Sequence, residues 1–337
     1  MYALINCDIY TGKQVEYDKA IIIDGDRIHD VVPTEEVPAG IEKQDLNGLC
    51  VAPGFIDIQV NGGGGVLFND APDVESIKTI IESHRRFGTT NLLPTFISGP
   101  ISGMRKAAQA VQACLDKKVP GVLGIHFEGP FISLEKAGIH DKRFIRRPTD
   151  EDLSVIRPLR GGATLLTIAP EVMPADIISE IARLGTRVSL GHTNGTIIVD
   201  GFHVNFATVR IAIRAKIKKR KIILVTDAMP PVGQPGCSGF QLGGHNIKVE
   251  NGCFVTEKGA LAGSALDMAT AVRNCVQKVG IAKDEALRMA STYPAEFLGM
   301  DNELGYIAPG YRANLVIFDN EIRVLATVVA GEYREAG

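Results

Sequence analysis

Short apolar runs rich in β-branched residues alternate with stretches of helical periodicity through the middle of the chain. Apolar residues recur at helical spacing after Asp73, for example at Ile77, Ile80 and Ile81. Near-continuous apolar strands that alternate with helices are typical of a parallel sheet, and this many units predict a TIM-like (β/α)8 barrel. The predicted barrel strands are residues 55–61, 91–95, 122–128, 164–169, 187–192, 197–203 and 222–227.

Both ends of the chain have shorter, strand-like runs. Asp24-Gly25-Asp26 lies between two β-branched runs, which predicts a hairpin. Residues 313–318 and 324–329, near the C-terminus, are two more strand-like runs. We therefore expect a small β-sandwich domain formed by residues 1–51 and 303–337, and a barrel domain formed by residues 52–302.

One junction between predicted strands leaves no room for a helix. Only residues 193–196 separate His192 from Ile197, whereas parallel neighbours need a crossover of about 10–12 residues. Either Asn194-Gly195 is a hairpin turn, or a strand–helix unit is absent between Thr196 and Ile197. Only seven barrel strands are predicted where closure needs about eight, so the count favours absence.

Polar residues stand at the C-terminal ends of several predicted strands, which a barrel gathers at one mouth. They are Gln59, Asn61, Glu128, His192, His203 and Asp227. A carboxylate and imidazoles are common ligands of hydrolytic metal sites, so Glu128 and His192 are candidate ligands. Asp227 is a candidate general base, with a helix N-cap as its alternative role.

Composition and short motifs exclude several classes of function. The 337 residues are 45% hydrophobic and 22% charged, as in soluble globular proteins. Because the chain has 36 basic and 39 acidic residues, and so no excess of positive charge, we expect no nucleic-acid partner. No leader pattern or long apolar segment is found, which predicts a cytoplasmic protein without a membrane partner. Six scattered cysteines predict neither disulfides nor a zinc knuckle.

The glycine run at residues 61–65 lacks the Lys-Ser/Thr of a phosphate-binding loop, so we expect a flexible turn near the mouth. The chain also has neither the G-x-S-x-G elbow of serine hydrolases nor a G-x-G-x-x-G dinucleotide fingerprint. These absences remove the serine-hydrolase and dinucleotide-binding interpretations.

Seven segments together resemble the amidohydrolase superfamily, and within it the N-acetylglucosamine-6-phosphate deacetylases. They are APGFIDIQVNG at 52–62, HFEGPF at 126–131, APE at 169–171, SLGHTN at 189–194, DGFH at 200–203, VTDAM at 225–229 and LAGS at 261–264. Most of the superfamily carries His-x-His after the first barrel strand, whereas Gln59 and Asn61 stand there, as in the deacetylases. The resemblance therefore implies one divalent metal ion per subunit, with zinc favoured over iron, cobalt and manganese.

The resemblance also implies a role for each matched residue. Glu128 and His192 correspond to metal ligands, Asp227 to the base, and His203 to the group that polarises the acetyl carbonyl. The implied substrate contacts are Ile139, His140, His203, Leu261, Ala262 and Gly263. In the family, a further strand supplies the third metal ligand and phosphate contacts, and this is the unit missing at the short junction. The favoured explanation is that the protein contains this segment and the given sequence omits it. A true deletion from the protein is the alternative.

The implied reaction is deacetylation of N-acetyl-D-glucosamine 6-phosphate to D-glucosamine 6-phosphate and acetate. It would serve amino-sugar catabolism and cell-wall sugar recycling, in a homodimer or homotetramer that binds a small sugar phosphate. Two alternatives remain open: another mononuclear amidohydrolase, such as a deaminase or cyclic amidase, or an inactive sugar-phosphate-binding scaffold if the unit is truly deleted.

Overall fold

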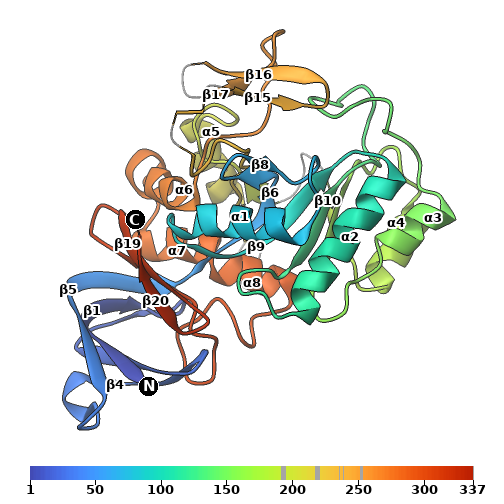
Figure 1. Ribbon diagram of the computed structural model, residues 1–337. Helices are drawn as coiled ribbons and strands as arrows, with labels where there is room; N and C mark the ends of the chain where they lie inside the picture. The colour runs from blue at the N-terminus through green and yellow to red at the C-terminus, as the bar shows by residue number, and fades with distance from the viewer. Residues whose placement is uncertain (191–194, 217–220, 235, 238, 251–252, 337) are drawn as a thin grey trace.

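A β-sheet built from both ends of the chain lies beside a barrel-like body of strands and helices (Figure 1). The computed structural model describes residues 1–190, 195–216, 221–234, 236–237, 239–250 and 253–336. None of the helices in these ranges is both long and apolar enough to cross a membrane.

The terminal sheet has the strand order β20-β19-β18-β5-β1-β3-β4, with β2 paired to β1. Its strands are β1 (Tyr2–Tyr10), β2 (Val15–Glu16), β3 (Lys19–Asp24), β4 (Arg27–Pro33), β5 (Glu42–Pro53), β18 (Leu315–Phe318), β19 (Val324–Val329) and β20 (Glu332–Glu335). The predicted hairpin is confirmed, because β3 pairs antiparallel with β4, and the two C-terminal runs also pair, β18 antiparallel with β19. A β domain assembled from both termini is thus confirmed, while its exact bounds stay a prediction.

The parallel sheet of the barrel has the order β12-β11-β10-β9-β6. Its strands are β6 (Phe55–Val60), β9 (Thr89–Ile97), β10 (Gly124–Glu128), β11 (Ala163–Ile168) and β12 (Arg187–Leu190). The short strands β13 (Thr196–Ile197) and β14 (Ile223–Leu224) form a second parallel pair. A parallel bridge between Val60 and Ala228 joins the segment after β14 to the end of β6, which curls the two sheets towards each other.

Helices cover the outside of these strands (Figure 1). Asp73 caps α1 by accepting a hydrogen bond from the Ser76 N–H at 2.9 Å, and Ile77 and Ile80 are buried against the sheet. The described helices are α1 (Val74–Arg85), α2 (Ile101–Asp116), α3 (Asp150–Val155), α4 (Ala175–Arg183), α5 (Phe206–Ala215), α6 (Met268–Asn274), α7 (Lys283–Ala290) and α8 (Thr292–Leu298), with a 3-10 turn (Thr34–Glu36) and a π-helical turn (Cys275–Val279).

At the short junction, β12 and β13 pair with different neighbours. β12 is parallel to β11 and β13 is parallel to β14, and the described residues show no antiparallel pair between β12 and β13. Thr196 and Ile197 are consecutive residues of β13 that face Ile223 and Leu224, and the position of the absent unit between them stays a prediction.

Two local predictions were also wrong. The expected strand 197–203 ends at Ile197, because the Asp200 side chain accepts the backbone N–H groups of Phe202 and His203 and turns the chain. The glycine run is an ordered hairpin rather than a flexible turn, formed by β7 (Gly62–Gly63) and β8 (Val66–Leu67). The N–H groups of Gly64 and Gly65 donate to the carbonyls of Val232 and Pro230, so they are not available to an anion.

Candidate active site

Three strand ends of the barrel meet in one hydrogen-bonded group. The Gln59 amide nitrogen donates to Glu128 Oε2 and to Asp227 Oδ1, both at 3.1 Å. Asn61 Nδ2 donates to the same Asp227 oxygen at 2.6 Å. The structure therefore brings together four of the predicted site residues, from β6, β10 and the segment after β14.

Glu128 lies beside His140. The distance from His140 Nε2 to Glu128 Oε1 is 3.8 Å, and Ser98 Oγ holds His140 Nδ1 at 2.9 Å. Burial raises the pKa of Glu128, but the neighbouring His140 and His126 imidazoles and the Gln59 amide outweigh it and lower that pKa overall. Glu128 is therefore a carboxylate at neutral pH.

Asp227 has the opposite character. Burial, and then the negative charge of Glu128, raise the pKa of Asp227 to about 7, although Asn61, His203 and Gln59 oppose the rise. A carboxyl group that titrates near neutral pH can both accept and return a proton. Asp227 is followed by a turn rather than a helix, so the alternative role of helix N-cap is excluded.

His203 is paired with Asp200, a residue whose role the sequence did not reveal. His203 Nδ1 lies 2.6 Å from Asp200 Oδ2, while Asp200 Oδ1 accepts the backbone N–H groups of Phe202 and His203. Burial lowers the pKa of His203, but the hydrogen bond and charge of Asp200, with the charge of Asp227, raise it overall. The (i, i+3) spacing of Asp200 and His203 was the available signal for this pair.

The segment 261–263 lies directly against Asp227. Gly263 has φ +68°, and a Cβ there would be 2.3 Å from Met229 Cε and 3.0 Å from the Asp227 carbonyl oxygen. Only glycine fits this close approach. Ala262 N donates to the Phe254 carbonyl at 3.0 Å, and Leu261 is 36% exposed.

A small sheet that the sequence did not predict supports this segment. Its strands are β15 (Gly239–Leu242), β16 (His245–Glu250) and β17 (Cys253–Val255). Phe254 of β17 packs with Met229 and Ala262 in one apolar cluster, and Ile139 packs against that cluster. Two predicted substrate-binding segments, 139–140 and 261–263, are thereby brought to the same side of the site.

Comparisons with known proteins identify the family. Residues 1–51 match the NagA composite domain and residues 184–334 match the amidohydrolase family. The N-acetylglucosamine-6-phosphate deacetylase of Haemophilus influenzae is 34% identical over 380 residues, covering 99% of this chain and 99% of the relative. The chain belongs to the N-acetylglucosamine-6-phosphate deacetylase family of amidohydrolases.

Further relatives agree with this membership. The crystal structure of the deacetylase of Pasteurella multocida superposes with a TM-score of 0.94 at 35% identity, covering 99% of both chains. The N-acetylgalactosamine-6-phosphate deacetylase of a Shewanella species is 36% identical over 331 residues, covering 85% of this chain and 83% of the relative. The family therefore includes relatives named for two epimeric sugar phosphates.

This member of the deacetylase family is short. The alignment with the Haemophilus influenzae relative spans 380 positions and the chain has 337 residues, so at least 43 aligned positions carry no residue of this chain. A strand with its crossover helix needs about 30 residues or more. The deficit is thus large enough for the unit that the strand count lacks.

Amidohydrolases are typically metal-dependent, and the described part of this deacetylase supplies only part of a metal site. Glu128 is a carboxylate with the right chemistry, but His192 lies outside the described residues. Within the described ranges, no group of three His, Cys, Asp or Glu side chains could hold a metal ion. One buried acceptor at the site, Asn61 Oδ1, has no hydrogen-bond partner among these residues. The donor chemistry fits a divalent cation, but the number of described donors stays below the usual three.

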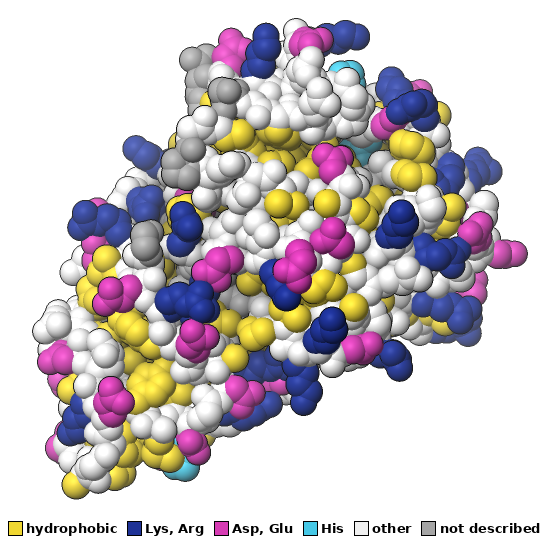
Figure 2. All heavy atoms as spheres, viewed as in Figure 1, with side chains coloured by type: hydrophobic (Ala, Val, Ile, Leu, Met, Phe, Trp, Pro, Cys, Tyr) yellow, Lys and Arg dark blue, Asp and Glu magenta, His cyan; other side chains and the backbone are white. Residues whose placement is uncertain are grey.

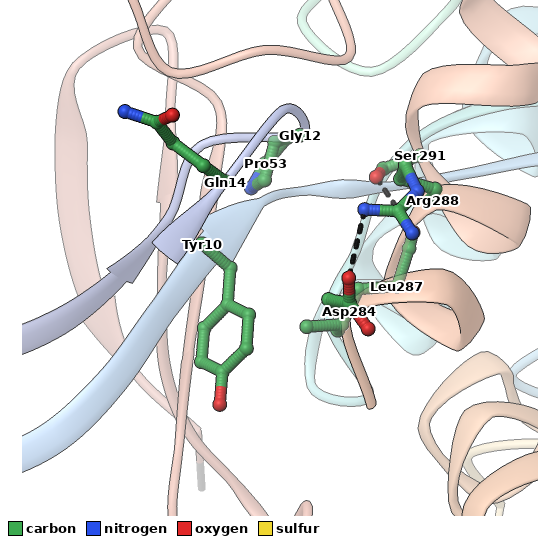
Figure 3. A pocket seen from close by; sticks show the side chains of 8 residues that line it. All are labelled: Tyr10, Gly12, Gln14, Pro53, Asp284, Leu287, Arg288 and Ser291. Atoms are coloured by element: carbon green, nitrogen blue, oxygen red, sulfur yellow. Dashed lines mark hydrogen bonds and ion pairs between the residues drawn. The ribbon is translucent and has the colours of Figure 1, made fainter. Parts of the chain in front are cut away.

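A small cavity away from Asp227 is not part of the candidate active site. It lies between the terminal sheet and α7, where Arg288 and Asp284 form an ion pair at 3.1 Å beside Tyr10 (Figure 3). Its volume of about 10 Å³ is enough for roughly one water molecule, so it cannot hold a sugar phosphate.

Proposed function

We propose that this chain hydrolyses the acetamide of N-acetyl-D-glucosamine 6-phosphate to D-glucosamine 6-phosphate and acetate. The observation that carries the proposal is the site itself: Asp227, with a pKa near 7, shares the Gln59 amide with the ionised Glu128. This arrangement occurs in a chain that is 34% identical to a deacetylase of that name over nearly its whole length. The reaction belongs to amino-sugar catabolism and cell-wall sugar recycling.

Acid–base chemistry falls to Asp227. An amide is a poor electrophile with a poor leaving group, so hydrolysis needs a proton removed from water and a proton delivered to nitrogen. Asp227 takes the first proton and returns it to the departing amine. The Gln59 and Asn61 amides both donate to Asp227 Oδ1, which leaves Oδ2 as the oxygen that exchanges the proton.

Charge that develops on the acetyl oxygen is stabilised by His203. Asp200 occupies Nδ1 of the imidazole, so Nε2 is the nitrogen that donates to the substrate carbonyl. His140 and Ile139 contact the sugar, together with the backbone of Leu261, Ala262 and Gly263. Ser98 fixes the orientation of the His140 ring through Nδ1.

Glu128 and His192 are the residues proposed to hold one divalent metal ion, zinc in the first place and iron, cobalt or manganese otherwise. Such an ion lowers the pKa of a bound water molecule towards about 7 and polarises a carbonyl group. We further propose a cytoplasmic homodimer or homotetramer that acts on a free sugar phosphate. Acidic and basic side chains alternate over the face in Figure 2, which fits a small-molecule enzyme better than a polyanion-binding protein.

A second candidate substrate is N-acetylgalactosamine 6-phosphate, because the Shewanella relative named for it is 36% identical. The test measures acetate released from both sugar phosphates, and ring opening of a cyclic amide, by metal-supplemented protein. Faster release from the glucosamine compound supports the proposal, and faster release from its epimer selects the second candidate. Absence of acetate from both, with or without cyclic-amide turnover, overturns the deacetylase assignment.

A further inference from the structure

Asp57 is a buried carboxyl group at the centre of the barrel. Its residue is 0% exposed, and none of the ion pairs among the described residues includes it. Three neutral donors face it instead. Thr226 Oγ1 donates to Oδ2 at 2.5 Å, and the backbone N–H groups of Gln59 and Thr226 donate to Oδ1 at 3.1 and 3.4 Å.

A buried acid without a cation is costly, and an apolar side chain of similar size would often be more stable there. Burial raises the pKa of Asp57 to about 7, against the lowering effect of its hydrogen bonds. Stability of the fold therefore does not explain why a carboxyl group stands at position 57.

The hydrogen bonds around Asp57 continue to both sides of Asp227. Because Thr226 Oγ1 donates to Asp57, its lone pair is free to accept the Ala228 N–H, at 3.2 Å. The Thr226 carbonyl accepts from Ser264 Oγ. Ala228 is thus fixed by a bond that depends on the hydroxyl oriented by Asp57, and the backbone of residue 226 is fixed by Asp57 and Ser264 directly.

Asp227 itself needs such support. Its φ is +53°, a left-handed conformation that is unfavourable for a residue other than glycine. Its N–H donates to the Gln59 carbonyl at 3.0 Å, and its carbonyl accepts the Ser264 N–H at 2.9 Å. Strained residues keep such a conformation only where their surroundings fix it.

We propose that Asp57 is a positioning residue for Asp227: through Thr226 and the Gln59 backbone it holds the base in its left-handed conformation against the Gln59 and Asn61 amides. The inference rests on the proposed function, in which Asp227 is the base. It adds a residue that touches neither substrate nor metal and acts only through its neighbours.

The first test uses Thr226, where a matched pair of variants is possible. Thr226→Val removes the hydroxyl at nearly constant volume, and Thr226→Ser keeps it. We expect Thr226→Val and Asp57→Leu to lower kcat by about 10- to 100-fold with KM nearly unchanged, as for a misplaced catalytic group. Thr226→Ser should restore most of the activity. Asp152→Asn is the control, because Asp152 of α3 is another buried carboxylate, and its side-chain partners are Arg146 and Thr149 rather than Asp57, Thr226 or Asp227.

The outcomes distinguish failure of the positioning role of Asp57 from failure of the proposed function. Wild-type kcat per folded molecule in both Thr226→Val and Asp57→Leu overturns the positioning role, and a loss of kcat in the control of the same size does so as well. If the wild-type protein releases no acetate, the proposed function fails, and a crystal structure of Thr226→Val then decides the positioning role. A negative φ at Asp227 supports it, and an unchanged positive φ with the Gln59 carbonyl still bonded overturns it.

Discussion

The Asp200–His203 pair allows a quantitative test of the electrostatics of the site. Asp200 Oδ1 accepts two backbone N–H groups at 2.9 Å, and Oδ2 lies 2.6 Å from His203 Nδ1. Asp200→Asn keeps an oxygen for the two backbone donors but places an amide nitrogen opposite Nδ1. The substitution therefore removes the charged half of the interaction and leaves the turn in place.

The magnitude follows from the burial of the pair. The His203 and Asp200 side chains are only 17% and 9% exposed, so water screens them less than a surface pair. A hydrogen bond to a charged group contributes about 1.5–3 kcal/mol. We expect Asp200→Asn to lower the free energy of unfolding by about 2 kcal/mol where both groups are charged.

The pH range in which both are charged is set by the direction of their pKa shifts. Burial raises the pKa of Asp200, but the hydrogen bonds from His203 and from the backbone lower it overall, so its stabilisation is complete above an ordinary pKa of about 4 and is lost as pH falls through the lowered value. The pKa of His203 is raised overall, so its stabilisation is complete below an ordinary pKa of about 6.5 and is lost as pH rises through the raised value. The difference between wild type and variant should be largest between about pH 4 and 6.5.

Urea unfolding followed by circular dichroism at acidic, intermediate and alkaline pH measures this difference. Asp319→Asn is a matched control, because Asp319 Oδ1 also accepts two backbone N–H groups while Oδ2 faces Arg323 Nε at 2.7 Å. Arg323 is 73% exposed and does not titrate in this range. Asp319→Asn should therefore lower the free energy of unfolding by no more than about 0.5 kcal/mol, and this difference should not decrease at alkaline pH. An Asp200→Asn difference that is the same at pH 5.5 and pH 9 would refute the reasoning.

Three further substitutions test separate parts of the site. Asp227→Asn should reduce acetate release by about 10²- to 10⁴-fold while the metal content, measured by mass spectrometry, stays unchanged; retained turnover would remove the base. Gly263→Ala places a Cβ 2.3 Å from Met229 Cε at a φ of +68°, so the free energy of unfolding should fall by about 1–2 kcal/mol, and an unchanged melting temperature would contradict the close approach. Ser98→Ala frees His140 Nδ1, so KM should rise with kcat little changed, whereas an equal loss in kcat would contradict a binding role for His140.

Elements that depend on local pattern were predictable from the sequence. The apolar run at 55–61 coincides closely with β6 (Phe55–Val60), because a strand buried on both faces needs apolar residues at nearly every position. The strand expected at 197–203 failed because a single Asx turn at Asp200 outweighed β-branched propensity. The β15–β17 sheet was missed for a related reason: its residues alternate weakly, and Phe254 is buried only through tertiary contacts.

The site was predictable where it follows from topology. Parallel strands of a barrel end at one mouth, so the sequence alone places Gln59, Glu128 and Asp227 together. Their supporting residues could not be found this way. Asp57 and Thr226 are 169 positions apart, and nothing in either local sequence indicates that one hydroxyl will face the other carboxylate. The pairing exists only once the barrel brings β6 against the segment after β14.

The two halves of the site differ in their dependence on the short junction. The acid–base half lies where β6 meets the segment after β14, and there the Val60–Ala228 bridge, the Asp227–Gln59 backbone bond and the Asp57–Thr226 contact join the strands. The expected metal half is completed at the other side, where β12 and β13 pair with different neighbours and where the resemblance placed the third ligand. Because these contacts do not involve the junction, loss of a strand–helix unit there would remove the expected third metal ligand before it disturbs the proposed base. A shortened deacetylase of this kind should therefore retain an ordered Asp227 even where its metal affinity is weakened.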